Sequence, residues 1–426
     1  MTFASLGLSS SLLRAVSEAS YAAPTPIQIA AIPAVLRGDD IRASAQTGSG
    51  KTAAFALPIL QLLARNPVES PRPVRALILV PTRELAMQIG ASFRGYAHHL
   101  AQPLKVIDVF GGVSINPQMM ALRGGADIVV ATPGRLIDLA EHNAVRLNGV
   151  TTLVLDEADK LFDLGFADEL KRILEMLPER RQTLLFSATF PTAVQTLAET
   201  ILREPVRIDI EAAPNTVPAI TQRAIAVDTA RRTQLLRQLI QDNSWTRVLV
   251  FVATKYSTEH VAEKLRRADI NAAAFHGELS QGARTQALAD FKAAKIQVLI
   301  ATDVAARGID IVQLPAVVNY DLPRSAVDYT HRIGRTGRAG ESGIAVSFVT
   351  AESEAHFRLI EKRNGVNLPR EQIAGFEPQE VASVQESTAA GTGGIKGKRK
   401  SKKDKLREAA AEESAPQPSV WPGRKP

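Results

Sequence analysis

The stretch "IRASAQTGSGKTAAF", residues 41–55, decides how the first part of the chain folds. Its centre has the glycines, lysine and hydroxyl of a phosphate-binding loop, with Gly48 and Gly50 followed by Lys51 and Thr52. Glycines let backbone N–H groups converge on phosphate oxygens where a side chain would obstruct them. We expect a strand before the loop and an amphipathic helix over residues 52–64 after it. Because Ala45 stands where the usual pattern opens with glycine, an ordinary Gly-Ser turn remains the alternative at this point.

A second signal is "LVLDEADK", residues 153–160, where Asp156 and Glu157 directly follow an apolar run. In open α/β sheets, ligands bind outside the carboxyl ends of the strands. An aspartate there can hold Mg²⁺, and a neighbouring glutamate can orient or deprotonate an attacking water. Carboxylates at strand ends are often only helix caps. Together with the upstream loop, however, this pair predicts nucleotide hydrolysis.

A third signal is "HRIGRTGRAG", residues 331–340, in which Arg332, Arg335 and Arg338 recur every third residue between glycines. A solvated basic turn would explain this pattern. The functional interpretation is a set of guanidinium groups that stabilise the charge on a γ-phosphate during phosphoryl transfer. Since these arginines lie far downstream of the loop, the chemistry would require two domains to close together.

Short runs rich in Val, Ile and Leu alternate with helix-like segments along the chain, which predicts α/β domains with parallel sheets covered by helices. Examples of the predicted strands are residues 75–80, 127–132 and 152–157. The pattern occurs twice, on either side of the proline-containing residues 211–220. We therefore expect a first domain over residues 1–210, a linker over 211–220 and a second domain over 221–370. Residues 371–426 read as a disordered basic tail, because eight of the twelve residues in 396–407 are Lys or Arg.

Composition excludes several classes of protein. The 426 residues include no cysteine, so disulfides, thiolate zinc sites and cysteine nucleophiles are ruled out. No secretory signal or run of 18 apolar residues is present, and we expect a cytoplasmic protein without membrane association. The formal charge of +7 indicates a polyanionic partner.

Taken together, the motifs carry a family resemblance. "AQTGSGKT" (45–52), "DEAD" (156–159), "SAT" (187–189) and "HRIGRTGR" (331–338) resemble the DEAD-box ATP-dependent RNA helicases. Further matches in the same order are "PTPIQ" (24–28), "PTREL" (81–85), "GG" (111–112), "TPGR" (132–135) and "ATDVAARGID" (301–310). The resemblance covers about residues 1–370, and the short core with a basic tail is most similar to the bacterial RhlE type. In this family the loop begins with alanine, which accounts for Ala45.

The resemblance implies two RecA-like domains, each with a mostly parallel sheet flanked by helices, and it assigns roles to particular residues. Those expected to bind ATP are Phe3, Gln28, Ala45, Gln46, Thr47, Gly48, Ser49, Gly50, Lys51, Thr52 and, at the ribose, Asp310. Those expected to take part in catalysis are Lys51, Asp156, Glu157, Arg335 and Arg338, with Thr52 and Asp156 as ligands of Mg²⁺. Ser187 and Thr189 are expected to link the hydrolytic site to the RNA site, and His331 and Arg332 are expected to help tie the two domains together, so that these four residues couple hydrolysis to RNA. Those expected to contact RNA are Arg83, Gly112, Thr132, Arg135, Gly277 and Thr302, with Arg284 as a further candidate.

The resemblance also implies the activity. We expect hydrolysis of ATP to ADP and phosphate, coupled to local, non-processive unwinding of RNA or remodelling of its protein complexes. The candidate RNA residues suit phosphates and 2′-hydroxyls rather than base edges, so binding should be largely independent of sequence. Ribosomal precursors or RNA-degradation assemblies are the expected partners of a monomeric core. The alternatives are a non-enzymatic RNA clamp or annealing scaffold and a DNA-directed or transporter-type ATPase; no "LSGGQ"-like stretch supports the transporter.

Overall fold

The computed structural model describes residues 1–45, 48–65, 70–210, 220–306, 311, 314–337 and 342–380. Four predicted site residues, Gln46, Thr47, Asp310 and Arg338, lie outside this part of the chain. So do nearly all of the predicted linker and the basic segment of the tail.

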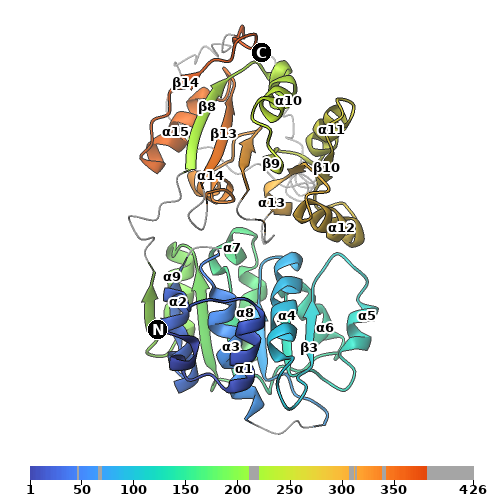
Figure 1. Ribbon diagram of the computed structural model, residues 1–426. Coiled ribbons are helices and arrows are strands. Elements are labelled where there is room, and N and C mark those ends of the chain that lie inside the picture. The colour runs from blue at the N-terminus through green and yellow to red at the C-terminus, as the bar shows by residue number, and fades with distance from the viewer. Residues whose placement is uncertain are drawn as a thin grey trace, which may run out of the picture. The chain divides into compact units, whose positions relative to one another are not determined.

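The chain forms two seven-stranded sheets whose strands are all parallel (Figure 1). The order of the first sheet is β3-β4-β2-β5-β6-β1-β7, and that of the second is β10-β11-β9-β12-β13-β8-β14. Adding seven to each strand number of the first sheet gives the second, so the two sheets share one topology. This confirms the predicted fold class of two RecA-like α/β domains. The boundaries proposed on either side of the linker stay predictions, although the last strand of the first domain ends at Asp209 and the first strand of the second begins at Ile220.

The first sheet is built from short strands that are buried on both faces. In β2, Ala76 and Ile78 pack into one apolar core, whereas Leu77 and Leu79 pack into the other. A strand covered on both sides needs a continuous apolar run rather than alternation, which is why these runs could be recognised in the sequence. The strands are β1 (Ile41–Ser44), β2 (Ala76–Leu79), β3 (Val106–Val109), β4 (Ile128–Ala131), β5 (Thr152–Leu155), β6 (Gln182–Ser187) and β7 (Val206–Asp209).

Helices cover both faces of this sheet (Figure 1). One core contains side chains of α1, α2, α3 and α4, and the other contains side chains of α6, α7, α8 and α9. The helices are η1 (Phe3–Leu6), α1 (Ser10–Glu18), α2 (Pro26–Arg37), α3 (Lys51–Ala64), α4 (Arg83–Ala97), α5 (Asn116–Ala121), α6 (Pro133–Glu141), α7 (Ala158–Asp163), α8 (Ala167–Glu175) and α9 (Thr192–Ile201).

The second sheet repeats this construction. Its strands are β8 (Ile220–Ala226), β9 (Val248–Phe251), β10 (Ala272–Phe275), β11 (Val298–Ala301), β12 (Ala316–Asn319), β13 (Gly343–Val349) and β14 (Arg370–Glu371). Its helices are η2 (Thr229–Arg231), α10 (Arg232–Asp242), α11 (Lys255–Arg266), α12 (Gln281–Lys292), α13 (Asp303–Ala306), α14 (Ala326–Ile333) and α15 (Glu354–Asn364). Within the described residues, no helix is long and apolar enough to cross a membrane.

The predicted start of the tail at residue 371 is too early. Strand β14 pairs with β8, and Phe376 is buried in a core of the second sheet, where the Arg231 guanidinium lies 4.8 Å from its ring centroid. Asp228 accepts hydrogen bonds from the backbone N–H groups of Gln379 and Glu380, each at 2.9 Å. The domain therefore continues at least to residue 380. Composition missed this segment because it is held by a few contacts with the rest of the domain: Phe376 and the half-buried Ile373 pack on the core, and the Glu371 carboxylate pairs with Arg223 at 2.7 Å.

Candidate functional site

The phosphate-binding loop joins β1 to α3, as the sequence predicts. Gly48 and Gly50 have positive φ angles of 83° and 93°, a conformation that favours glycine. A Cβ atom at Gly50 would lie 2.5 Å from Gln28 Nε2, so a side chain there would displace the Gln28 amide. Lys51 is the first residue of α3, and its buried Nζ donates a hydrogen bond to the Ala45 carbonyl oxygen at 3.1 Å. The lysine ammonium therefore lies against the strand side of the loop.

Gln28 fixes the loop from the neighbouring helix α2. Its Oε1 accepts a hydrogen bond from the Thr25 N–H at 2.9 Å, and its Nε2 donates to the Gly50 carbonyl oxygen at 3.1 Å. The side chain is only 4% exposed. After these two bonds the Gln28 amide nitrogen can still donate one hydrogen bond and the amide oxygen can still accept one. The predicted contact between Gln28 and adenine therefore stays possible.

Phe3 lies deeper than its predicted role in stacking near the base requires. Its ring is 6% exposed and packs against Tyr21, with the centroids 6.3 Å apart and the planes inclined by 26°. Tyr21 is 39% exposed and shares a 2.7 Å hydrogen bond between its hydroxyl and that of Tyr96. Of these two stacked rings, Tyr21 is therefore the accessible one. Tyr21 was not among the predicted site residues.

Asp156 and Glu157 form a buried acidic pair at the carboxyl end of β5. Burial raises the pKa of Asp156 to about 6, although the Lys51 charge acts in the opposite direction. Burial also acts to raise the pKa of Glu157, but the charges of Lys160, Lys51 and Arg335 outweigh it and lower that pKa. The Lys160 ammonium lies 2.9 Å from Glu157 Oε2. Glu157 is therefore held ionised, as a base must be.

Glu157 also has an unusual backbone. Its φ angle is 53°, which is sparsely populated for a residue with a side chain. The Glu157 N–H donates to Asp156 Oδ1 at 2.9 Å, so the two acidic residues are fixed relative to each other. Strained residues of this kind cluster at functional sites, which agrees with the catalytic role predicted for Glu157.

Ser187 and Thr189 are connected to the acidic segment through Asp159. Asp159 Oδ2 accepts hydrogen bonds from the Thr189 N–H at 3.0 Å and the Thr189 hydroxyl at 2.9 Å. The Ser187 Oγ accepts from the Asp159 N–H at 3.1 Å and donates to the Thr189 carbonyl oxygen at 2.7 Å. Asp159 was not among the predicted site residues, although its place in the "DEAD" stretch was visible. The structure makes it the link between the two segments.

The residues around the loop fit a phosphate chain with a hard divalent cation. The buried Ser49 Oγ has no hydrogen-bond partner among the described residues, and the Thr52 hydroxyl follows it at the start of α3. Asp156 supplies a carboxylate, and carboxylate and hydroxyl oxygens are ligands that Mg²⁺ prefers. No group of three or more His, Cys, Asp or Glu side chains that could hold a metal occurs within the described ranges.

The second domain contributes Arg335 and His331. Arg335 is 6% exposed and is one of the cations that lower the pKa of Glu157. Burial, together with the charge of Lys160, lowers the pKa of His331, so that this imidazole is neutral at neutral pH. Both observations agree with the predicted approach of this segment to the nucleotide site.

Arg332 has a different environment from the one predicted. Its guanidinium donates to both carboxylate oxygens of Asp303 at 2.6 and 2.7 Å, to Asn319 Oδ1 at 3.0 Å and to the Asp321 carbonyl oxygen at 2.6 Å. All these partners belong to the second domain, where they join α14 to α13 and to the end of β12. The geometry favours a role for Arg332 in the stability of this domain over the predicted tie between domains.

The predicted RNA residues follow the carboxyl ends of strands that are neighbours within each sheet. In the first sheet they follow β3, β4 and β2, which are neighbours, whereas the nucleotide residues follow β5, β6 and β1. Gly112 lies beside Arg83, because a Cβ at Gly112 would be 2.9 Å from Arg83 Nη1. Thr132 is the N-cap residue of α6, and Arg135 Nη2 donates to the Val113 carbonyl oxygen at 2.6 Å. In the second sheet, Gly277 and Thr302 follow the neighbouring strands β10 and β11.

Two of the candidate arginines are paired with one carboxylate. Arg83 Nε donates to Glu84 Oε1 at 2.9 Å, and Arg284 Nη2 lies 2.6 Å from the same oxygen. Arg284 is 3% exposed and also lies over the Phe275 ring. Binding of an RNA phosphate by either arginine would therefore compete with Glu84.

Comparison with known proteins agrees with this geometry. The DEAD/DEAH box helicase family matches residues 25–197, and the helicase conserved C-terminal domain matches residues 231–340. The ATP-dependent RNA helicase DeaD of Mycobacterium tuberculosis is 42% identical over 396 residues, which are 92% of this chain and 69% of that protein. The DEAD-box ATP-dependent RNA helicase CshA of Bacillus cereus is 41% identical over 361 residues, covering 85% of this chain and 68% of that protein.

A solved structure of a related protein has a similar fold. S. cerevisiae Dbp5 bound to RNA and ADP BeF3 has a TM-score of 0.75 and 32% identity, covering 87% of this chain and 95% of the yeast chain. Matching family regions in both domains, relatives above 40% identity and a shared fold all agree. This chain therefore belongs to the DEAD-box family of ATP-dependent RNA helicases.

Proposed function

We propose that this chain hydrolyses ATP at the Lys51–Asp156–Glu157 cluster and uses the cycle to separate short stretches of paired RNA. The observation that carries the proposal is the burial of these three charged side chains at the ends of β1 and β5, where 6%, 3% and 4% of them are exposed. Burying charged side chains costs free energy unless they pair with one another or with a ligand. A cluster of this kind is typical of a site for phosphoryl transfer.

Each residue has a separate task in this proposal. Lys51 pairs with the outer phosphates of ATP. Glu157, held ionised by Lys160, accepts a proton from the attacking water, and Arg335 stabilises the negative charge that develops on the transferred phosphoryl group. Thr52 and Asp156 would hold Mg²⁺, which would neutralise charge on the phosphate oxygens. Gln28 and Tyr21 position the adenine.

The RNA is held through its backbone. Arg83, Gly112, Thr132 and Arg135 present guanidinium, N–H and hydroxyl groups along three adjacent strand ends, and such groups bind phosphates and 2′-hydroxyls. The Asp159–Ser187–Thr189 network lies between these strands and the phosphate loop, so it is positioned to transmit the state of the nucleotide to the RNA. Closure on one strand would disrupt a few base pairs, each stacking step being worth about 1–2 kcal/mol.

We also propose a cytoplasmic location, a monomeric core of the RhlE type and substrates among ribosomal precursors or RNAs undergoing degradation. The net charge of +7 supports a polyanionic partner, and the absence of cysteine suits a reducing compartment.

The proposal is tested by measuring phosphate release from ATP with no nucleic acid, with RNA and with DNA of the same sequence. RNA should stimulate release strongly, and DNA should do so weakly or not at all. Equal stimulation by both would contradict backbone recognition through 2′-hydroxyls. RNA binding without any stimulated release would instead indicate the non-enzymatic clamp.

A further inference from the structure

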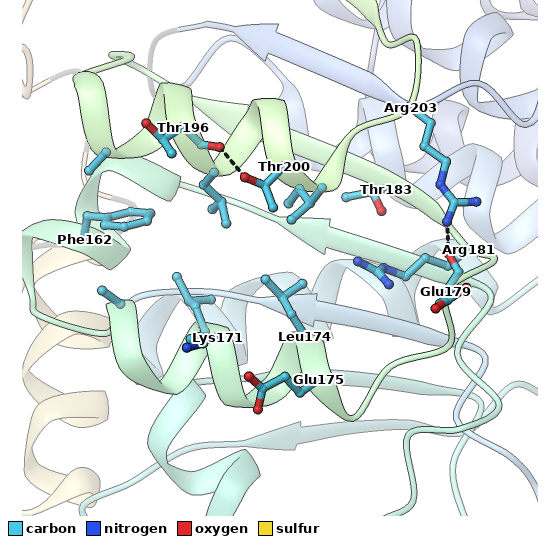
Figure 2. A pocket seen from close by; sticks show the side chains of 15 residues that line it. Phe162, Lys171, Leu174, Glu175, Glu179, Arg181, Thr183, Thr196, Thr200 and Arg203 are labelled. Atoms are coloured by element: carbon cyan, nitrogen blue, oxygen red, sulfur yellow. Dashed lines mark hydrogen bonds between the residues drawn. The ribbon is translucent and has the colours of Figure 1, made fainter.

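An open groove of about 610 Å³ lies between helices α8 and α9 of the first domain (Figure 2). Aliphatic side chains line it along both helices, and Arg181, Arg203 and Glu179 lie at one end. Arg181 donates a hydrogen bond to the Pro178 carbonyl oxygen at 2.7 Å, and Arg203 donates to that of Glu179 at 2.6 Å. Because the charges at this end are mixed and both arginines are bonded, the groove gives a ligand no charge preference. The second domain carries a surface feature with more specific chemistry.

That feature is an exposed aromatic pair on α11. Among the described Phe, Tyr and Trp residues, Tyr256 has the most exposed side chain, with 73% exposed. The imidazole of His260, one helical turn further along, stacks on the Tyr256 ring, with the centroids 5.7 Å apart and the planes inclined by 14°. A single exposed ring needs no explanation. Two nearly parallel rings at the surface, however, form a flat face on which another planar group can stack.

The repeated topology places this pair beside the predicted RNA residues. Strand β9, which precedes α11, is the neighbour of β11, and β11 is the neighbour of β10. Thr302 follows β11, and Gly277 follows β10. In the first sheet β2 takes the place of β9, and Arg83 is the first residue of α4 just as Lys255 is the first residue of α11. Tyr256 therefore lies next to the position that corresponds to a predicted RNA contact.

Two contacts join this end of α11 to the loop that contains Gly277. The Lys255 ammonium pairs with the Glu278 carboxylate, and His276 Nε2 lies 2.9 Å from Glu259 Oε1. His276 and Glu278 are the residues on either side of Gly277. The end of α11 that carries the aromatic pair is therefore fixed beside this loop.

The charges around the pair decide which part of an RNA it can contact. Glu259 and Glu278 lie on this surface, and Glu263 on the next turn of α11 pairs with Arg267. Carboxylates disfavour a phosphate, whereas a base is uncharged and has a flat face. A base within a duplex is already paired and stacked on its neighbours, so an aromatic side chain stacks on an unpaired one.

We propose that Tyr256, supported by His260, stacks on one unpaired base of an RNA whose backbone passes Gly277 and Thr302. The inference rests on the proposed RNA binding, and it adds a base contact to recognition that otherwise uses phosphates and 2′-hydroxyls. Because the stack forms only with an unpaired base, it stabilises the separated strand. Purines have the larger face and should be modestly preferred at this one position.

Fluorescence of 2-aminopurine locates the stacked base. A single 2-aminopurine is moved along a ten-nucleotide oligouridine, which is bound to the full chain with a non-hydrolysable ATP analogue. The wild type should quench the probe at one position, Tyr256→Ala should not, and Tyr256→Phe should restore the quench because the ring is kept. The proposal is overturned if no position is quenched or if Tyr256→Ala quenches like the wild type.

Affinity for two matched RNAs separates a base contact from a backbone contact. With adenine at the located position, Tyr256→Ala should bind about tenfold more weakly than the wild type, and Tyr256→Phe should bind like it. With an abasic nucleotide at that position, the wild type and Tyr256→Ala should bind equally. Fluorescence anisotropy of end-labelled RNA measures both. An equal loss on the two RNAs, or no loss on either, would overturn the proposal.

Leu359→Ala is the matched control, since it shortens a side chain of α15 in the same domain that is 59% exposed. It should leave the quench and both affinities unchanged. Tyr256→Ala should keep the wild-type urea midpoint, because the side chain that it removes is largely exposed. A wild type that binds no RNA would overturn this proposal together with the proposed function. A wild type whose phosphate release responds to RNA, but without a quench that depends on Tyr256, would overturn this proposal alone.

Discussion

Gly50 shapes the phosphate loop through its backbone conformation and its contact with Gln28. Gly50 combines a φ of 93° with a Gln28 Nε2 atom 2.5 Å from any added Cβ. Gly50→Ala should therefore displace Gln28 from the loop and weaken ATP binding by at least about tenfold, which is roughly 1.4 kcal/mol. Titration with a fluorescent ATP analogue measures the change.

Gly95 provides the matched control. It lies inside α4 with no atom within 4 Å of an added Cβ. Gly95→Ala should leave ATP affinity unchanged and raise helix stability by about 0.5–1 kcal/mol. If both variants bind ATP like the wild type, the steric account of the loop is wrong.

At this scale, the sequence predicted most residues that matter chemically. Lys51, Asp156 and Glu157 could be identified because phosphate binding and water activation need particular groups at fixed spacings. Asp159 and Tyr21 were missed for a different reason. Their importance comes from contacts with Thr189 and Phe3, which are distant in sequence and meet only in the folded domain.

At the scale of elements, Asp127 connects the residues that come just before three neighbouring strands, β4, β2 and β3. Asp127 precedes β4 and is 1% exposed; it pairs with Arg75 before β2 at 2.7 Å, and it accepts a hydrogen bond from the Lys105 N–H before β3 at 2.8 Å. Arg75 contacts Oδ1 of Asp127, whereas Arg72 contacts Oδ2, the oxygen that also accepts from the Lys105 N–H. Although burial opposes ionisation, these partners lower the pKa of Asp127.

Asp127→Asn should lower the free energy of unfolding by about 3 kcal/mol, because it leaves partly buried arginines without a charged partner. Urea unfolding followed by circular dichroism measures the difference. The pKa of Asp127 is lower in the folded chain than the 3.8 of an ordinary aspartate, so its contribution is complete only well above that value and is lost as the pH falls through the lower folded pKa. The gap between wild type and variant should narrow on acidification; a gap that widens would contradict this assignment.

The same scale shows which elements sequence reasoning could not find. Strands β3 and β7 lie at the edges of the first sheet, and each contains an aspartate and exposed or half-buried positions. An edge strand is covered less completely, so it lacks the continuous apolar run by which β2, β4 and β5 were recognised. Strand β14 has only two residues and no sequence signal of its own.

At the scale of the whole molecule, residues 371–380 belong to the second domain. A chain that ends at residue 370 loses Phe376 and the bonds from Gln379 and Glu380 to Asp228, whereas one that ends at 380 keeps them. The shorter chain should be less stable by about 2–4 kcal/mol, since it exposes the apolar surface beneath Phe376. Urea unfolding followed by Trp245 fluorescence reports the second domain alone, because Trp421 is absent from both chains. Equal urea midpoints for the two chains would show that residues 371–380 add nothing to the stability of the second domain.

Removal of residues 381–426 tests the basic segment separately. This chain keeps the folded domain but lacks the Lys- and Arg-rich residues 396–407. Its RNA affinity should be lower, and the slope of log affinity against log salt should be shallower, because fewer counterions are released. Filter binding over a series of salt concentrations measures the slope. An unchanged slope would mean that the segment does not contact RNA.

The two-domain plan itself was predictable, because each sheet requires its own set of buried runs and the set occurs twice. The extent of the second domain was not. Composition reports whether a segment can form a core alone, whereas residues 371–380 add Phe376, Ile373 and the Glu371–Arg223 ion pair to a core that already exists.

The central claim is that Glu157, held ionised beside Lys160 and Lys51, is the base for ATP hydrolysis. Single-turnover hydrolysis of RNA-bound ATP by Glu157→Gln tests it most directly, with ATP and RNA affinities measured on the same protein. We predict near wild-type affinities and a hydrolysis rate lower by about 10²–10⁴-fold. A rate equal to that of the wild type would contradict the claim.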